Sequence, residues 1–148
     1  MGIVINNQLN LNMAEIFDQM ELPASELAKS RGVLAGGPVQ LERGFVLHRT
    51  GRVWNSTLTI SKDISLTVSK DIIAAIASDQ APPEAVVALG YAGWGAGQLE
   101  EEIAENTWLT LEADSDIIFN TPCDQRWSKA ALLLGVDLNL ISGTAGHA

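Results

Sequence analysis

The chain has 148 residues and a formal net charge of −9 at pH 7, from eighteen acidic and nine basic side chains. Its 47% hydrophobic and 18% charged residues are typical of a globular domain and exclude a disordered chain. The negative charge argues against direct binding to DNA or to anionic lipid, and a single cysteine, Cys123, excludes an internal disulfide.

Two further features concern where the protein works. No apolar run approaches the ~20 residues that a membrane-spanning helix needs, and the first residues lack the basic segment of a signal peptide. A lone cysteine suits a reducing compartment. We therefore expect residues 1–148 to form a single cytoplasmic domain without membrane contact.

The first residues predict a strand and then a helix. Residues 2–7 read as a strand that opens the chain without an earlier partner, which would leave an unpaired edge and favour a homo-oligomer. Asn12 and Glu15 have the spacing of a helix-capping box, and the helix should run to about Glu21. Its apolar residues recur at helical spacing, which favours core packing over a partner-binding face; they are Met13, Ile16, Phe17 and Met20.

The middle of the chain predicts mostly strands. A polar connection over residues 25–31 leads to a short strand at 33–35, which ends in Gly36-Gly37-Pro38. Residues 44–48 and 52–54 flank a glycine turn, which is the pattern of a hairpin. Two more short strands, at 58–60 and 64–67, should be followed by a helix that begins at the N-cap Ser69 and stops at Pro82-Pro83.

A glycine-rich turn then separates a strand from a helix. Residues 86–89 predict a buried strand that runs into the turn at 90–97, and an acidic helix should follow at 99–105. The glycines of this turn allow backbone angles and close approaches that other residues resist. Trp94, placed among them, would either fill the core or form the wall of a pocket.

The last third predicts two strands, at 108–111 and 116–119, and a helix. Thr121-Pro122 has the order of a cap and a first-turn proline, and Gly135 suits the end of that helix. Three of its residues share one face: Trp127, Ala131 and Leu134. Two segments complete the chain, an ambiguous one at 138–142 and a tail at 143–148 that should fray.

Strands and helices mix without a regular βαβ alternation, which indicates an α+β fold. We expect a mixed and strongly curled, half-barrel-like sheet with several short helices packed on it.

The glycine-rich turn does not match a phosphate-binding loop. It lacks Gly-x-x-x-x-Gly-Lys and the spacing Gly-x-Gly-x-x-Gly. The acidic residues 100–102 would also repel a phosphate at the start of the helix. A tight turn packed by Trp94 is the simpler interpretation, and a pocket for a neutral small molecule or peptide is the alternative.

The remaining reactive residues predict no catalytic set, no metal and no cofactor. Glu101 and Glu105 lie one helical turn apart, but a solvated acidic face explains them better than a metal site. His48 could act as a general base, yet no nucleophile elbow accompanies it, so a structural or surface histidine is favoured. Cys123 is favoured as an inert thiol because Asp124 opposes the effect of the helix dipole.

Several motifs occur in order along nearly the whole chain. The longer ones are Met1-Gly2-Ile3-Val4-Ile5-Asn6, Gly36-Gly37-Pro38-Val39, Arg43-Gly44-Phe45-Val46-Leu47-His48, Gly90-Tyr91-Ala92-Gly93-Trp94 and Gly97-Gln98-Leu99-Glu100. The shorter ones are Ser69 with Asp71, Trp108-Leu109, Arg126-Trp127 and Leu134-Gly135. In these motifs the sequence resembles the AlgH/YqgE-like family of small bacterial proteins.

The resemblance also shows two departures from the family. Members usually carry a further segment of roughly thirty residues before the first strand, and its loss would expose a sheet edge. We therefore expect that this chain begins late or comes from a truncated reading frame. Asn7 stands where the family commonly ends an Asn-Arg-Pro motif.

The resemblance implies no settled activity. Most members are uncharacterised, and one is provisionally named a transcriptional regulator of exopolysaccharide production. Our hypothesis is a non-enzymatic, cytosolic binding or regulatory protein that acts through an unknown protein or small-molecule partner. The alternative is an enzyme of unknown class with a pocket at the glycine turn and His48.

The predicted binding surface combines the glycine turn with residues that could line one cleft with it. Its members are Gly36, Gly37, Pro38, His48, Tyr91, Gly93, Trp94, Gly97, Gln98 and Trp127.

Overall fold

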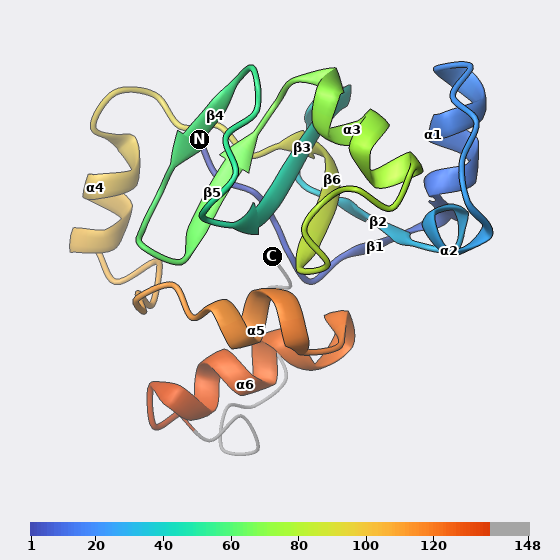
Figure 1. Cartoon of the computed structure of the whole chain (residues 1–148). Coiled ribbons are helices and arrows are strands. Elements are labelled where there is room, and N and C mark those ends of the chain that lie inside the picture. The colour runs from blue at the N-terminus through green and yellow to red at the C-terminus, as the bar shows by residue number, and fades with distance from the viewer. Residues whose placement is uncertain (137–148) are drawn as a thin grey trace.

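A six-stranded mixed sheet, in the order β1-β2-β6-β3-β5-β4, runs through the centre of the computed structural model, which describes residues 1–136 (Figure 1). The predicted segments at 138–142 and 143–148 lie outside the described residues. The strands are β1 (Gln8–Asn12), β2 (Gly32–Ala35), β3 (Val39–Arg49), β4 (Thr57–Thr59), β5 (Ile64–Thr67) and β6 (Ala85–Tyr91). The helices are α1 (Met13–Gln19), α2 (Glu26–Lys29), α3 (Lys70–Ala77), α4 (Gln98–Ala104), α5 (Ser115–Asn120) and α6 (Arg126–Leu133), with a 3₁₀ turn, η1, at Cys123–Gln125.

The sheet confirms the predicted α+β class. β6 pairs in parallel with β2 and antiparallel with β3, so the sheet is mixed. It is open, with β1 and β4 at its two edges. None of the helices within residues 1–136 is long and apolar enough to cross a membrane.

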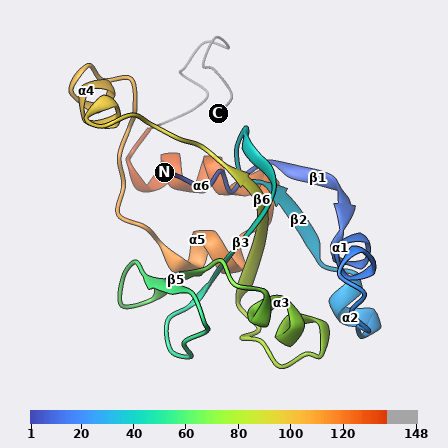
Figure 2. The same ribbon diagram turned by 90° about the horizontal axis from the view of Figure 1, so that it is seen from above.

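A hydrophobic core lies on each face of the sheet, because successive side chains of a strand point to opposite faces. Val46 of β3 belongs to the first core, with Met13 and Phe17 of α1 and the apolar side of α3. Phe45 of β3 belongs to the second core, where it packs with Ile118 of α5. Viewed from above, α1 and α2 lie on one side of β6, and α5 and α6 lie on the other (Figure 2).

The glycines of the sheet allow one segment of backbone to cross another. β2 and β3 follow each other in the chain but lie on opposite sides of β6, so the short connection between them must cross β6. A side chain on Gly36 would overlap the carbonyl oxygen of Gly90, and one on Gly37 would overlap the carbonyl group of Tyr91. Gly37 and Gly90 also have positive φ angles, of 153° and 76°. This is the close approach predicted for the glycine-rich turn.

The start of the chain differs from the strand predicted at 2–7. Gly2 forms an isolated antiparallel bridge with Ala92, and the Val4 N–H donates to the Gly36 carbonyl at 2.8 Å. The first regular strand, β1, begins only at Gln8. The crossing explains this difference. β2 stops pairing with β6 at Gly36, where the chain turns to cross β6, and Gly2 then pairs with Ala92, just beyond the end of β6.

Capping groups place the first helices. Asn12 Oδ1 accepts the Ala14 N–H at 3.0 Å, and α1 follows as predicted, with Met13 and Phe17 fully buried. Ser25 caps a second short helix, α2, in the segment predicted as a polar connection. One turn of helix with a single buried residue, Ala28, leaves no periodic pattern from which to predict it.

Three further predicted strands are wrong. Residues 52–54 form no strand, because β5 occupies the place beside β3 and Trp54 is buried in the first core instead. Residues 108–111 have no partner strand in the described sheet. Residues 116–119 belong to helix α5, because Asp114 Oδ1 accepts the N–H groups of Asp116 and Ile117 and starts a helix there. The predicted last helix begins as the 3₁₀ turn η1 after Pro122 and continues as α6.

Candidate functional site

The structure distributes the predicted binding surface over separate regions. Gly36, Gly37 and Tyr91 lie at the crossing over β6. Gly93, Trp94 and Gly97 lie between that crossing and α4, and Gln98 is the first residue of α4. Pro38 directly precedes the eleven-residue strand β3, and His48 is the second-last residue of that strand, so most of the strand separates them. Trp127 lies on α6, with 48% of its surface exposed.

Glu102 of α4 joins the two tryptophans next to the glycine turn. Its Oε2 accepts the indole N–H of Trp94 at 3.1 Å and that of Trp108 at 2.7 Å, and its Oε1 accepts from Gln98 at 3.0 Å. The two indole rings meet edge to face, with centroids 6.0 Å apart. The hydrogen bond from Trp108, and then that from Trp94, lowers the pKa of Glu102. Trp94 is thus held by α4, and binding at this surface stays a prediction.

His48 is a fully buried histidine with both ring nitrogens in hydrogen bonds. Nδ1 lies 2.8 Å from the Arg49 carbonyl oxygen, so it carries the proton and donates. Nε2 then accepts from Thr67 Oγ1 at 2.8 Å. Thr67 also contacts the Thr57 hydroxyl, at 2.8 Å. The ring therefore links β3, β5 and β4, and its neighbours account for both of its polar atoms.

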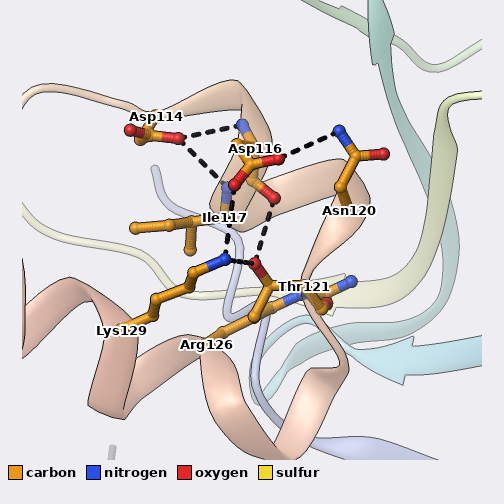
Figure 3. Close-up of polar contacts among 7 residues, drawn as sticks. All are labelled: Asp114, Asp116, Ile117, Asn120, Thr121, Arg126 and Lys129. Atoms are coloured by element: carbon orange, nitrogen blue, oxygen red, sulfur yellow. Dashed lines mark hydrogen bonds and ion pairs between the residues drawn. The ribbon is translucent and has the colours of Figure 1, made fainter.

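Trp127 belongs to the corner between α5 and α6, which polar contacts hold together (Figure 3). Thr121 Oγ1 donates to the Asp116 carbonyl at 3.1 Å, and Lys129 Nζ lies 3.3 Å from Asp116 Oδ2. The hydrogen bond from Lys129 lowers the pKa of Asp116, with a smaller effect from Asn120. These contacts link the two helices, and Trp127 remains 48% exposed on α6.

A cleft that the sequence analysis missed lies between α1 and α3, over β3 and β6. Its volume is about 380 Å³. Val46, Ile73 and Leu89 contribute apolar surface, and Ile16 and Met20 of α1 line it as well. The signal was present in the sequence, because Ile16 and Met20 belong to the apolar stripe assigned to the core. Half of that stripe, Met13 and Phe17, is fully buried, and the other half faces the cleft.

Polar groups line the same cleft. Lys70 of α3 brings one positive charge to it, and Glu42 brings one negative charge. Lys70 forms no ion pair within residues 1–136. Arg43 of β3 lines the cleft as well, but its guanidinium group lies over the ring of Phe45 in the second core, 5.5 Å from the ring centroid. Thr67 also lines the cleft, and its hydroxyl group bonds to His48 and Thr57.

The start of α3 beside the cleft is held by side chains rather than by a simple cap. Ser69 occupies the predicted N-cap position, but its hydroxyl donates to Asp71 Oδ1 and accepts the Ser56 N–H at 3.1 Å. The hydrogen bond from Ser69 lowers the pKa of Asp71, and backbone N–H groups act in the same direction. The described residues contain no group of three or more His, Cys, Asp or Glu side chains that could hold a metal ion.

Comparisons with known proteins point to one family. A family model described as AlgH-like matches residues 1–139. A UPF0301 protein of Saccharophagus degradans is 55% identical, over 100% of this chain and 73% of the relative. A UPF0301 protein of Thioalkalivibrio sulfidiphilus is 52% identical, over 100% of this chain and 80% of the relative.

Solved structures agree with this. The solution structure of the AlgH protein from Pseudomonas aeruginosa superposes with a TM-score of 0.80 at 43% identity, over 100% of this chain and 79% of that one. A crystal structure of a Corynebacterium diphtheriae protein, 12% identical, matches 86% of this chain and 66% of its own with a TM-score of 0.61, which is a likeness of fold alone. The names of these proteins state no activity. The chain belongs to the AlgH-like family.

Proposed function

We propose that the protein is a non-enzymatic binding protein of the bacterial cytoplasm that holds a small amphipathic molecule in the cleft between α1 and α3. The observation that carries the proposal is the cleft itself, about 380 Å³ in volume and lined by apolar side chains and by Lys70, a cation that forms no ion pair within residues 1–136. Ligand sites are typically mostly apolar concavities of this size with a few convergent polar groups. A regulatory role would follow if the occupied cleft changed the way α1 and α3 are held on the sheet.

The lining indicates the chemistry of the ligand. An apolar body would pack on Val46, Ile73 and Leu89, which removes apolar surface from water. A negatively charged head group would lie near Lys70, where it compensates the charge of the ammonium group. A ligand with both properties is an amphipathic anion.

The fluorescent probe 8-anilinonaphthalene-1-sulfonate has an apolar body and one anionic group, so it tests the cleft directly. Gly44 lines the cleft, and a Cβ atom built on it would meet no atom within 4 Å. Gly44→Leu should therefore fill the cleft while the protein stays folded. We expect it to abolish saturable enhancement of the probe's fluorescence.

A charge reversal tests whether the probe binds in the cleft or elsewhere on the surface. Lys70→Glu should weaken probe binding about tenfold, because one interaction with a charged group is worth about 1.4 kcal/mol. Lys62→Glu changes the net charge equally at an exposed residue outside the cleft and should leave the affinity unchanged. Equal affinity of Gly44→Leu, Lys70→Glu and the unmodified protein for the probe would contradict the proposal.

A further inference from the structure

A second groove, distinct from the cleft, gathers two arginines. It lies where the starts of β2 and β6 meet the turn between α5 and α6, and its volume is about 360 Å³. Arg31, Thr121, Cys123 and Arg126 line it. Two of only nine basic residues in a chain with a net charge of −9 therefore meet in one concavity.

Arg126 is a buried cation without a carboxylate partner. Arg126 is only 8% exposed, and burial lowers the pKa of its guanidinium group. Nε donates to the Thr121 carbonyl at 3.2 Å, and Nη1 donates to the Ile5 carbonyl. Figure 3 shows Arg126 beside Thr121 at this corner. No acidic side chain within residues 1–136 pairs with it, so carbonyl dipoles alone compensate its charge.

Arg31 is the second cation of the groove. Its Nη2 donates to the Pro83 carbonyl at 3.1 Å. Its Nη1 is buried and has no hydrogen-bond partner among the described residues. Neither Arg31 nor Arg126 forms an ion pair within residues 1–136, so the groove carries two positive charges without a carboxylate. A concavity with this charge favours a negatively charged ligand.

We propose that this groove binds the oxyanion group of a small molecule, a phosphate or a carboxylate, between Arg31 and Arg126. Guanidinium groups present planar, fixed donors that suit the oxygens of either group. The bound oxygens would place a negative charge near the two guanidinium groups. Thr121 contributes its shape but no hydroxyl donor, because its Oγ1 already donates to the Asp116 carbonyl.

The charge of the groove can be measured through the reactivity of Cys123, because Cys123 is the one cysteine of the chain and lines the groove. Alkylation of its thiol by iodoacetate, an anion, can be compared with alkylation by neutral iodoacetamide. An electropositive groove raises the ratio of the two rates. We expect Arg31→Gln to lower this ratio about fivefold, since two opposite unit charges about 4 Å apart in water attract each other by about 1 kcal/mol.

Two controls keep the result specific. Arg43→Gln removes the same charge from β3, outside the groove, and should leave the ratio unchanged. Arg126→Gln risks unfolding, because Arg126 is buried and binds the Ile5 carbonyl, so the test rests on the partly exposed Arg31. Circular dichroism and the thermal midpoint verify that Arg31→Gln stays folded.

Protection by small anions identifies the oxyanion. Inorganic phosphate or succinate should slow the reaction of Cys123 with iodoacetamide in a saturable way, and potassium chloride at equal ionic strength should not. Protection by phosphate alone assigns a phosphate group, and protection by succinate alone assigns a carboxylate. The proposal is overturned if the rate ratio is the same in Arg31→Gln, or if neither anion protects beyond the effect of chloride. Probe binding in the α1–α3 cleft is measured separately, so either proposal can fail alone.

Discussion

At the scale of the residue, the glycines at the crossing of β6 matter because two backbones touch there. We predict that Gly37→Ala destabilises the protein by at least about 3 kcal/mol, because a Cβ atom would overlap the Tyr91 carbonyl and Gly37 has a φ of 153°. Urea denaturation followed by circular dichroism measures the change. Gly44→Ala is the matched control, since a Cβ at Gly44 meets nothing within 4 Å and the free energy of unfolding should change by less than about 1 kcal/mol. Equal stability of both variants would contradict the crossing.

Glu102 gives a second prediction at this scale. Its native pKa is lowered, first by the Trp108 N–H and then by the Trp94 N–H. A lowered native pKa stabilises the fold above the unfolded-state pKa, and this contribution is lost as the pH falls through the native pKa. We expect tryptophan fluorescence to change in acid with a midpoint below the ordinary glutamate value.

Variants at α4 assign that fluorescence change. Glu102→Gln should remove the acid transition, because an amide does not titrate and still offers one acceptor oxygen. Glu101→Gln, on the same helix but outside the tryptophan cluster, should retain it. A transition that persists in Glu102→Gln would show that another group controls the indoles.

At the scale of the element, α5 and α6 are anchored by apolar contact more than by their polar network. We predict that Ile118→Ala costs about 3 kcal/mol, because Ile118 is buried against Phe45 and Leu47 in the second core. Lys129→Ala should cost less than about 0.5 kcal/mol, because its ion pair with Asp116 is half exposed at both ends. Denaturant unfolding of both variants measures the two losses of stability. A larger loss in Lys129→Ala than in Ile118→Ala would show that the polar contacts drawn in Figure 3 anchor the helices more strongly than the apolar ones.

At the scale of the whole molecule, the open edge at β1 bears on self-association. β1 pairs only with β2 within the described sheet, and unpaired edges are templates for another strand. The sequence predicts self-association through residues 2–7, but Gly2 and Val4 already bond to Ala92 and Gly36. We therefore propose that two copies associate through β1 instead, and we expect a concentration-dependent dimer in sedimentation equilibrium. Asn10→Lys places a charge on this edge and should shift the equilibrium to the monomer. A monomer at every concentration of the unmodified chain would contradict the proposal.

Sequence reasoning predicted the elements whose signal is local. Alternation and β-branched residues identified β5 at its observed bounds, and Asn12 located the start of α1. It failed where two signals competed: Ile117, Ile118 and Phe119 favour a strand, but the cap at Asp114 and the contact with the second core make them a helix. The arginine groove joins residues 31 and 126, and no spacing in the chain relates them.

The family, the α+β class, the acidic charge and the glycines that permit a crossing could be read from the amino-acid sequence, because they depend on composition, on motifs and on local backbone preference. Which residues meet in space could be read only from the folded structure. In the structure His48 is buried in the core and does not lie at a surface. Ile16 and Met20 of the apolar stripe of α1 line a cleft, and Arg31 and Arg126 line one groove. The physical reason is that pairing across a sheet and packing of helices on its faces join residues far apart in the chain, and local propensity carries no information about such pairs.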